Sequence, residues 1–220
     1  DISRTELDEL GVRSHARALQ ATEEGRFEPE MVPMTVGDET YMTDQGIRPG
    51  TSVETLAGLK PAFKEDGKIT AGNASQVSDG AAAVMLMSRE KADELGLKAR
   101  ARIVDTTTVG VDPVIMLTGP IPATRKILER NSMGIGDVDL VEINEAFASV
   151  VLAWEKELKP DMDRVNVNGG AIAIGHPLGS TGARLMTSLL HEMERDDKEM
   201  GLVTMCCGGG IGTGTLLQKL

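Results

Sequence analysis

Cysteines, aromatic residues and long hydrophobic runs are all scarce in this sequence. The two cysteines, Cys206 and Cys207, are adjacent, which excludes a disulfide framework and a zinc site built from spaced cysteine pairs. Aromatic residues make up only 2% of the chain, so a base-stacking platform for nucleic acids is hard to build. No apolar run reaches the roughly 18 residues of a membrane span, and the polar start at Asp1 does not resemble a signal peptide. We therefore expect a soluble, cytoplasmic protein.

The charge balance is acidic. The 220 residues include 34 acidic and 23 basic ones, which gives a net charge of -11 at pH 7. This charge repels phosphate backbones and anionic membranes unless a local basic patch intervenes, so we expect neither as a general partner. Apolar residues make up 40% of the chain, enough for the core of one large domain or two small ones.

The first part of the chain predicts one long helix followed by a loop-rich segment. Ser3 and Glu6 have capping-box spacing, and apolar residues then recur at helical intervals, so we predict a helix over 4–23. Four prolines punctuate residues 26–70, which predicts irregular structure with a short helix near 53–59.

From residue 81 onward, apolar runs alternate with helical patterns. The run at 81–87 is continuously apolar and predicts a buried strand, after which a helix starts near Ser88 and closes at Gly96. Further strands are predicted at 101–107, 138–143, 202–206 and 213–218, and further helices at 121–130, 146–158 and 177–194. This alternation favours an α/β layered sheet.

The glycine-rich segment 169–184 surrounds a histidine, His176, in the sequence GGAIAIGHPLGSTGAR. Pro177 suits the first turn of a helix, which predicts that His176 lies beside a helix N-terminus whose dipole lowers the pKa of the imidazole and keeps it neutral. The alternative is a tight loop that packs a helix on a sheet and contains a structural histidine.

The cysteine pair stands where a predicted strand meets the glycine-rich sequence GGGIGTG. Successive strand residues point to opposite faces, so only one of Cys206 and Cys207 can enter a given site. A thiol near its free pKa of about 8.5 at a strand end is suited to proton exchange at neutral pH. The alternative is a pair of small buried hydrophobic residues before a turn.

Asn144 follows the predicted strand 138–143, at the carboxyl end where ligands bind in open α/β sheets. Asparagine is also a preferred helix N-cap, which would need no further function. A fourth segment, 70–80, is made of small and polar residues and lines a ligand channel or merely forms a turn.

Taken together and in this order, NASQVSDGAAA, NEAFA, GGAIAIGHPLGSTGAR and CCGGGIGTG resemble the thiolase family over essentially the whole chain. The chain is similar to only the later part of a thiolase, because the family's nucleophilic cysteine lies in an N-terminal half that has no counterpart here. The resemblance implies an α/β thiolase fold: a mixed five-stranded sheet with helices on both faces, forming the C-terminal half of a five-layered αβαβα assembly, plus part of a loop domain. It assigns 1–76 to the loop domain, 77–98 to the last strand and helix of the N-terminal half, and 99–220 to the C-terminal domain.

The resemblance also implies catalytic roles. His176 resembles the histidine that activates the nucleophilic thiol and helps to bind the thioester oxygen. Cys206 resembles the second catalytic cysteine, which shuttles protons, and Asn144 the residue that holds an oxyanion-hole water. Gly208 would contribute its backbone N–H to the other oxyanion hole. Cys207 matches no family role.

Coenzyme A enters as a substrate, with no metal or redox cofactor. Ser75 and Ala71 resemble residues that contact its pantetheine arm, and Arg48 resembles the arginine near its nucleotide end.

The implied activity is that of an acyl-CoA C-acyltransferase. We expect thiolytic cleavage of 3-ketoacyl-CoA to acetyl-CoA and a shortened acyl-CoA, in the β-oxidation of fatty acids or of sterol side chains. The alternatives are acetoacetyl-CoA synthesis by an acetyl-CoA acetyltransferase, and a noncatalytic fragment or scaffold subunit that binds coenzyme A. A condensing enzyme acting on an acyl carrier protein is disfavoured by Cys206 in CxGGG, since such enzymes resemble the fold but typically use a single cysteine.

The same resemblance implies partners. These 220 residues alone are expected to be inactive, because the nucleophile comes from the N-terminal half, in the same or a separate chain. A strand at 81–87 that is apolar on both faces would be a liability if exposed, so we expect another polypeptide segment to cover it. The family also forms homodimers or homotetramers.

Overall fold

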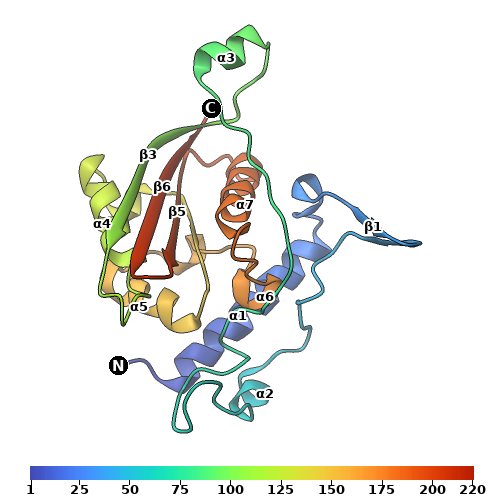
Figure 1. The fold of residues 1–220 in the computed structure, drawn as a ribbon, viewed down its shortest axis with the longest axis vertical. Helices are drawn as coiled ribbons and strands as arrows, with labels where there is room; N and C mark the ends of the chain where they lie inside the picture. Colours follow the sequence, from blue (N-terminus) through green and yellow to red (C-terminus); the bar gives the residue numbers. More distant parts are fainter. The chain divides into compact units, whose positions relative to one another are not determined.

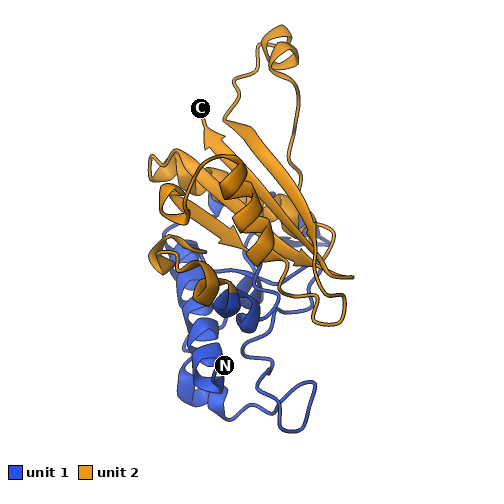
Figure 2. Cartoon of the chain, turned by 90° about the vertical axis from the view of Figure 1, so that its left-hand side faces the viewer, with its two compact units in different colours: residues 1–79, 144–153, 166–177 blue, residues 80–143, 154–165, 178–220 orange.

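The computed structural model describes all 220 residues and divides them into two compact units. Unit 1 comprises residues 1–79, 144–153 and 166–177, and unit 2 comprises residues 80–143, 154–165 and 178–220 (Figure 2). None of the helices combines the length and hydrophobicity that a transmembrane span requires.

Unit 1 is organised around the long helix α1 (Arg4–Glu23), which spans the predicted residues. The predicted capping box is present: the Ser3 side chain accepts the Glu6 N–H, and the Glu6 carboxylate accepts the Ser3 N–H. The buried face of α1 packs against two short helices, α2 (Val53–Ala57) and α6 (Ala171–Ile174). Between α1 and α2 the chain is loop-rich as predicted, with a 3-10 turn η1 (Glu28–Glu30) and an exposed hairpin of β1 (Met34–Val36) and β2 (Glu39–Tyr41).

Unit 2 contains a mixed four-stranded sheet, of which three strands are labelled in Figure 1. Its strands are β3 (Ala101–Gly110), β4 (Leu140–Ile143), β5 (Met200–Cys207) and β6 (Ile211–Lys219), in the order β3-β6-β5-β4. The β4 and β5 strands are parallel, whereas the β3–β6 and β5–β6 pairs are antiparallel.

The mixed sheet was predicted, but with five strands. In place of the fifth strand the structure has one parallel bridge between Val165 and Val141. Val165 follows the 3-10 turn η3 (Met162–Arg164) and precedes Asn166, whose φ of 48° is left-handed. Only Val165 is therefore extended here, which is too short for a ladder of β-sheet hydrogen bonds along β4.

Helices cover both faces of this sheet, as predicted (Figure 1). A Cβ on Gly201 would meet Met193 and Leu189 of α7 (Thr181–Arg195), so this face of β5 lies under α7. Thr204 is three residues further along β5 and so points to the other face, where its cross-strand partner Gly214 faces α4 (Pro120–Arg130).

The remaining helices are short or divided between the units. The first six residues of α5 (Ala148–Leu158) belong to unit 1 and the rest to unit 2. Within unit 2, fully buried Trp154 of α5 donates its indole N–H to Thr124 of α4 at 3.0 Å. The 3-10 turn η2 (Ile135–Asp137) follows α4, and α3 (Arg89–Glu94) is capped by Ser88 and closed by Gly96 as predicted.

The predicted buried strand at 81–87 was wrong. These residues form no strand, and Met85 and Leu86 are 78% and 63% exposed. A β-strand is stabilised by hydrogen bonds to a neighbouring strand, and no strand of this structure pairs with the segment. The apolar run alone therefore leaves an exposed extended chain.

The predicted helix 177–194 was wrong at its start. The helix α7 begins at Thr181, and a turn occupies 178–180. Gly179 and Ser180 are weak helix formers, so the favourable position of Pro177 does not extend the helix backward. The four-residue helix α6 was not predicted, because it is shorter than any periodic pattern.

We expect Gly212→Ala to destabilise unit 2 by about 1–3 kcal/mol. A Cβ on Gly212 would lie 2.2–2.5 Å from backbone atoms of Gly119, which cannot rotate away as a side chain can. Gly110→Ala in the same sheet is the control, since a Cβ there meets nothing within 4 Å. Urea unfolding measures the difference, and equal midpoints for the two variants would contradict the packing described here.

Candidate active site

Asn144 and His176 meet within unit 1. Asn144 follows the last residue of β4, as predicted, and is completely buried. Its Nδ2 lies 3.2 Å from Nε2 of the half-buried His176. When Asn144 donates this hydrogen bond, Nε2 is the acceptor and the ring proton of a neutral His176 lies on Nδ1. Since α5 begins only at Ala148, Asn144 is not the N-cap of that helix.

The other atom of the Asn144 amide has no partner. Its Oδ1 is buried and accepts no hydrogen bond in the structure. Buried polar atoms nearly always have a partner, so an orphan acceptor beside a histidine calls for an explanation. It is suited to accept a hydrogen bond from a water molecule or a substrate group.

His176 does not lie at a helix N-terminus, contrary to the prediction. It follows the C-terminal end of α6 and precedes α7 by five residues. Its backbone N–H donates to the carbonyl of Gln76 at 3.1 Å, and Gly175 before it has a φ of 88°, which glycine adopts easily. The helix N-terminus that we expected beside this imidazole is therefore absent.

Cys206 and Cys207 belong to unit 2, at the end of β5. Cys206 shares the α4 face of the sheet with Thr204 and is buried, whereas Cys207 points to the α7 face and is half-buried. The predicted separation of the two thiols is confirmed. Gly208 is exposed at the start of the turn 208–210 that connects β5 to β6.

Burial changes the acidity of these thiols. It raises the pKa of Cys206 to about 11, and it raises the pKa of Cys207 as well. The prediction of a cysteine near its free pKa is thus wrong for Cys206 in this structure. At neutral pH the Cys206 thiol is protonated, which suits a proton donor better than a nucleophile.

The residues predicted to bind coenzyme A all lie in unit 1. The backbone N–H of Ser75 donates to Ala146 at 3.0 Å, and Ala74 forms a bridge with Phe147, so this segment lies beside the NEAFA motif. Ala71 and Arg48 are exposed. The backbone N–H of Arg48 donates to Nδ1 of buried His15 at 3.2 Å.

Two residues that the sequence patterns did not single out contact the same segments. Glu145 stands next to Asn144, and Gln76 stands next to Ser75. The available signal was that each is a polar side chain directly beside a residue already assigned to the site.

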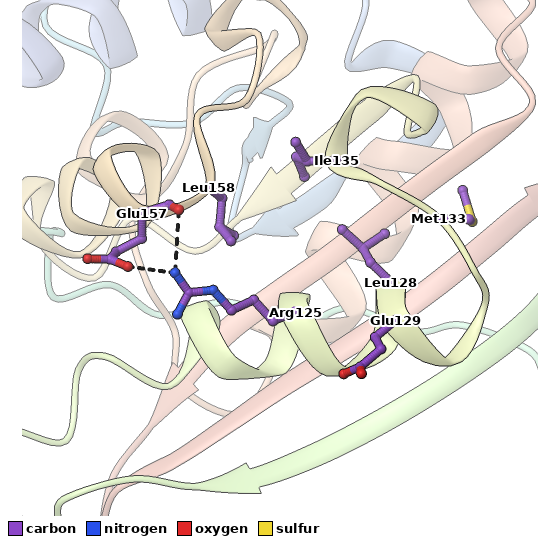
Figure 3. A pocket seen from close by; sticks show the side chains of 7 residues that line it. All are labelled: Arg125, Leu128, Glu129, Met133, Ile135, Glu157 and Leu158. Atoms are coloured by element: carbon purple, nitrogen blue, oxygen red, sulfur yellow. Dashed lines mark hydrogen bonds and ion pairs between the residues drawn. The ribbon is translucent and has the colours of Figure 1, made fainter.

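A surface groove in unit 2 contains none of the predicted site residues. It has a volume of about 480 Å³ and lies between α4, the turn after it and the end of α5. Figure 3 shows the Arg125 guanidinium at its rim, turned toward Glu157, with which it forms an ion pair at 2.6 Å. Leu128 and Ile135 supply its apolar wall. Its ionisable side chains are Arg125, Glu129 and Glu157, two of which pair with each other, and we do not assign this groove to the candidate site.

Two known family models match this chain. The model for "Thiolase, C-terminal domain" matches residues 97–219, and the model for "Thiolase, N-terminal domain" matches residues 1–90. The chain belongs to the thiolase family.

Individual thiolases match along the full length of the chain. Acetyl-CoA acetyltransferase of Syntrophomonas wolfei is 50% identical, over 100% of this chain and 57% of the relative. The steroid 3-ketoacyl-CoA thiolase FadA6 of Mycobacterium tuberculosis is 49% identical, over 100% of this chain and 54% of the relative. Human mitochondrial 3-ketoacyl-CoA thiolase, solved in complex with CoA, superposes with a TM-score of 0.94 at 41% identity, over 100% of this chain and 55% of that one.

These matches confirm the predicted thiolase fold. The chain spans about half the length of the curated relatives it matches, 57% and 54% for the two named above. The predicted roles of the site residues, and the meeting of Cys206 with Asn144 and His176, stay predictions.

We expect iodoacetamide to alkylate Cys207 faster than Cys206 at about pH 7.5, because the thiolate is the reactive form. Cys206 is buried and its pKa is raised to about 11, whereas Cys207 is half-buried. Timed quenching and peptide mass spectrometry give the two rates. In Cys207→Ser the Cys206 rate should still rise steeply above neutral pH, and faster modification of Cys206 at pH 7.5 would contradict its burial.

We expect His15 to make stability pH-dependent. Burial, and then the charge of Arg48, lowers the pKa of His15 below its usual value. The unfolded chain therefore binds the proton more readily, and stability falls as pH drops below about 6.5. Urea unfolding of the wild type and of His15→Gln between about pH 7.5 and 5 tests this. The variant should have the shallower slope, and identical slopes would rule out a contribution from His15.

Proposed function

We propose that this chain contributes to a thiolase that transfers acyl groups between coenzyme A thioesters by cleaving 3-ketoacyl-CoA. The observation that carries the proposal is the Asn144–His176 pair, 3.2 Å apart, with a buried acceptor of Asn144 unpartnered beside it. An imidazole and an amide in this arrangement can bind the oxygen of a thioester, directly and through a water molecule.

The first half of the proposed reaction breaks a carbon–carbon bond. A nucleophilic cysteine, which these residues do not supply, attacks the C3 ketone after His176 accepts its proton at Nε2, which releases the hydrogen bond from Asn144. The C2–C3 bond then breaks, and its electron pair forms the enolate of acetyl-CoA. Oxyanion donors such as the Gly208 N–H and the Asn144-bound water stabilise the negative oxygens, each donor contributing about 3–4 kcal/mol.

Cys206 is the proposed proton donor to the enolate. Its pKa of about 11 means that it carries the proton at neutral pH, and proton transfer leaves it as a thiolate. In the second half this thiolate takes the proton of an incoming coenzyme A thiol, which attacks the acyl-enzyme and releases the shortened acyl-CoA. The nucleophilic cysteine leaves as a thiolate and regains the proton that His176 held, which restores the starting state. Because the first product leaves before coenzyme A attacks the covalent acyl-enzyme, the kinetics should be ping-pong.

Coenzyme A is the proposed second substrate, held by Ser75, Ala71 and Arg48. The position of Ser75 beside the NEAFA motif supports this assignment, as does the relative that was solved in complex with CoA. The reaction requires no metal or redox cofactor for its electron balance.

We favour degradation of fatty acids or sterol side chains as the context. A relative named as a steroid 3-ketoacyl-CoA thiolase, 49% identical, supports it. Acetoacetyl-CoA synthesis is the second candidate, since a relative of 50% identity is named acetyl-CoA acetyltransferase. The ratio of thiolysis rates on acetoacetyl-CoA and on a longer 3-ketoacyl-CoA distinguishes degradation from acetoacetyl-CoA synthesis.

We also propose that the nucleophile and the cover of residues 81–87 come from polypeptide outside these 220 residues, and that the enzyme is a homodimer or homotetramer. The exposure of Met85 and Leu86 supports the missing cover. The rival proposal is a noncatalytic chain that binds coenzyme A as a scaffold. It predicts coenzyme A binding without turnover, even in the complete gene product.

We expect Cys206→Ala in the complete gene product to lower thiolysis about 10²- to 10⁴-fold while an acyl-enzyme still forms. The cause is loss of the proton donor, which leaves acyl transfer to the nucleophile intact. Stopped assays of acetoacetyl-CoA cleavage and intact mass of the acylated protein measure the two steps.

Cys207→Ala is the matched control and should keep near-normal turnover. If Cys207→Ala is instead the crippling change, the assignment of the pair is wrong. If the wild type cleaves no 3-ketoacyl-CoA, the proposed activity itself fails.

A further inference from the structure

The helix α6 lies in the glycine-rich motif just before His176 and is only four residues long, Ala171–Ile174. A helix leaves its first N–H groups and last carbonyls without intrahelical partners, so in α6 nearly every backbone group needs a partner from elsewhere. An isolated helix of this length is not stable in water. What holds α6 in place therefore also holds His176, which comes two residues after it.

Glu145 supplies partners at the start of α6. Its buried carboxylate accepts the Ile172 N–H at 3.2 Å and the Ser14 hydroxyl at 2.6 Å. The same hydroxyl oxygen accepts the Gly170 N–H at 3.1 Å, and Asn166 donates its amide to the other carboxylate oxygen at 3.0 Å. The carboxylate also packs directly on the Gly170 backbone, where a Cβ would lie 2.4 Å from Cδ of Glu145.

Gln76 supplies partners at the end of α6. The two hydrogens of its side-chain NH₂ are shared among three carbonyls, those of Ile172 at 2.9 Å, Ala173 at 3.0 Å and Gly46 at 2.9 Å. Its backbone N–H donates to Ala171 at 3.4 Å, and its carbonyl accepts the His176 N–H at 3.1 Å. A single residue thus binds α6 and the backbone of the histidine itself.

The charge of the Glu145 carboxylate and the partial charge of the Gln76 amide both match the dipole of α6. A carboxylate lies at the positive N-terminal end of α6 and amide N–H donors lie at the negative C-terminal end. Both residues are adjacent to site residues in the sequence: Glu145 follows Asn144, and Gln76 follows Ser75. Displacing either end of α6 would therefore change the 3.2 Å contact between Asn144 and His176.

We infer that Glu145 and Gln76 are positioning residues, which cap α6 from outside the helix and thereby set the geometry of His176 against Asn144. This inference rests on the proposed function only for its effect on turnover. Its structural part, the anchoring of 171–176, can be measured without any substrate.

The experiment compares isosteric variants in the complete gene product. Gln76→Glu replaces the NH₂ donors by carboxylate oxygens that face three carbonyls, and Glu145→Gln replaces a charged acceptor by an amide. Gln20→Glu and Glu65→Gln are the matched controls, because both side chains are exposed on unit 1. Amide hydrogen exchange by mass spectrometry and steady-state thiolysis are measured for all four.

We expect faster exchange at 171–176 in both test variants, with α1 still protected, and a fall in kcat of about 100-fold as the histidine is misplaced. The controls should match the wild type in both readouts. Unchanged exchange at 171–176 would overturn the inference, and so would wild-type kcat per folded molecule.

Two further experimental outcomes also have a defined meaning. If Glu145→Gln fails to fold, the half-buried Gln76→Glu alone decides. If the wild type has no thiolase activity, the proposed function fails while the exchange measurement still decides whether the two residues anchor α6.

Discussion

The hydrogen bonding of α6 is the constraint on which the rest of unit 1 depends. This helix is too short to satisfy its own backbone, so Glu145, Ser14 and Gln76 complete it from three other segments. Each of these segments also contributes to the candidate site or to the core: α1 through Ser14, the NEAFA motif through Glu145, and the 70–80 segment through Gln76. The contacts that set the geometry of the candidate site are therefore also the contacts that stabilise this part of unit 1.

In unit 2, the hairpin of β5 and β6 determines the environment of the two cysteines. Alternation along β5 sends Cys206 and Cys207 to opposite faces of the sheet, and only Cys206 is buried. The same burial that protects this thiol raises its pKa to about 11 and keeps it protonated. Acidity here follows from packing, without a nearby charge of opposite sign.

Several elements of the fold and two residues of the candidate site could be predicted from the sequence, and the reason differs from one element to the next. The helix α1 has a capping box and several turns of apolar spacing, which are local signals. The strand at 81–87 was wrongly predicted because strand formation depends on a neighbour that no local pattern reveals. For α6, the stabilising partners are distant in sequence: Ser14 and Gly170 are 156 positions apart. The contact between Asn144 and His176 likewise follows from such long-range bonds, although the motifs suggested both residues.

The interleaving of the two units has a consequence for how the chain folds. Unit 1 is assembled from three separate stretches, the last of which ends at residue 177, and unit 2 fills the gaps and the remainder. Neither unit is encoded by one continuous stretch, so a nascent chain on the ribosome cannot complete unit 1 until about four-fifths of these residues have emerged. Long-range contacts of this kind slow folding, and no single cut in the chain separates the two units.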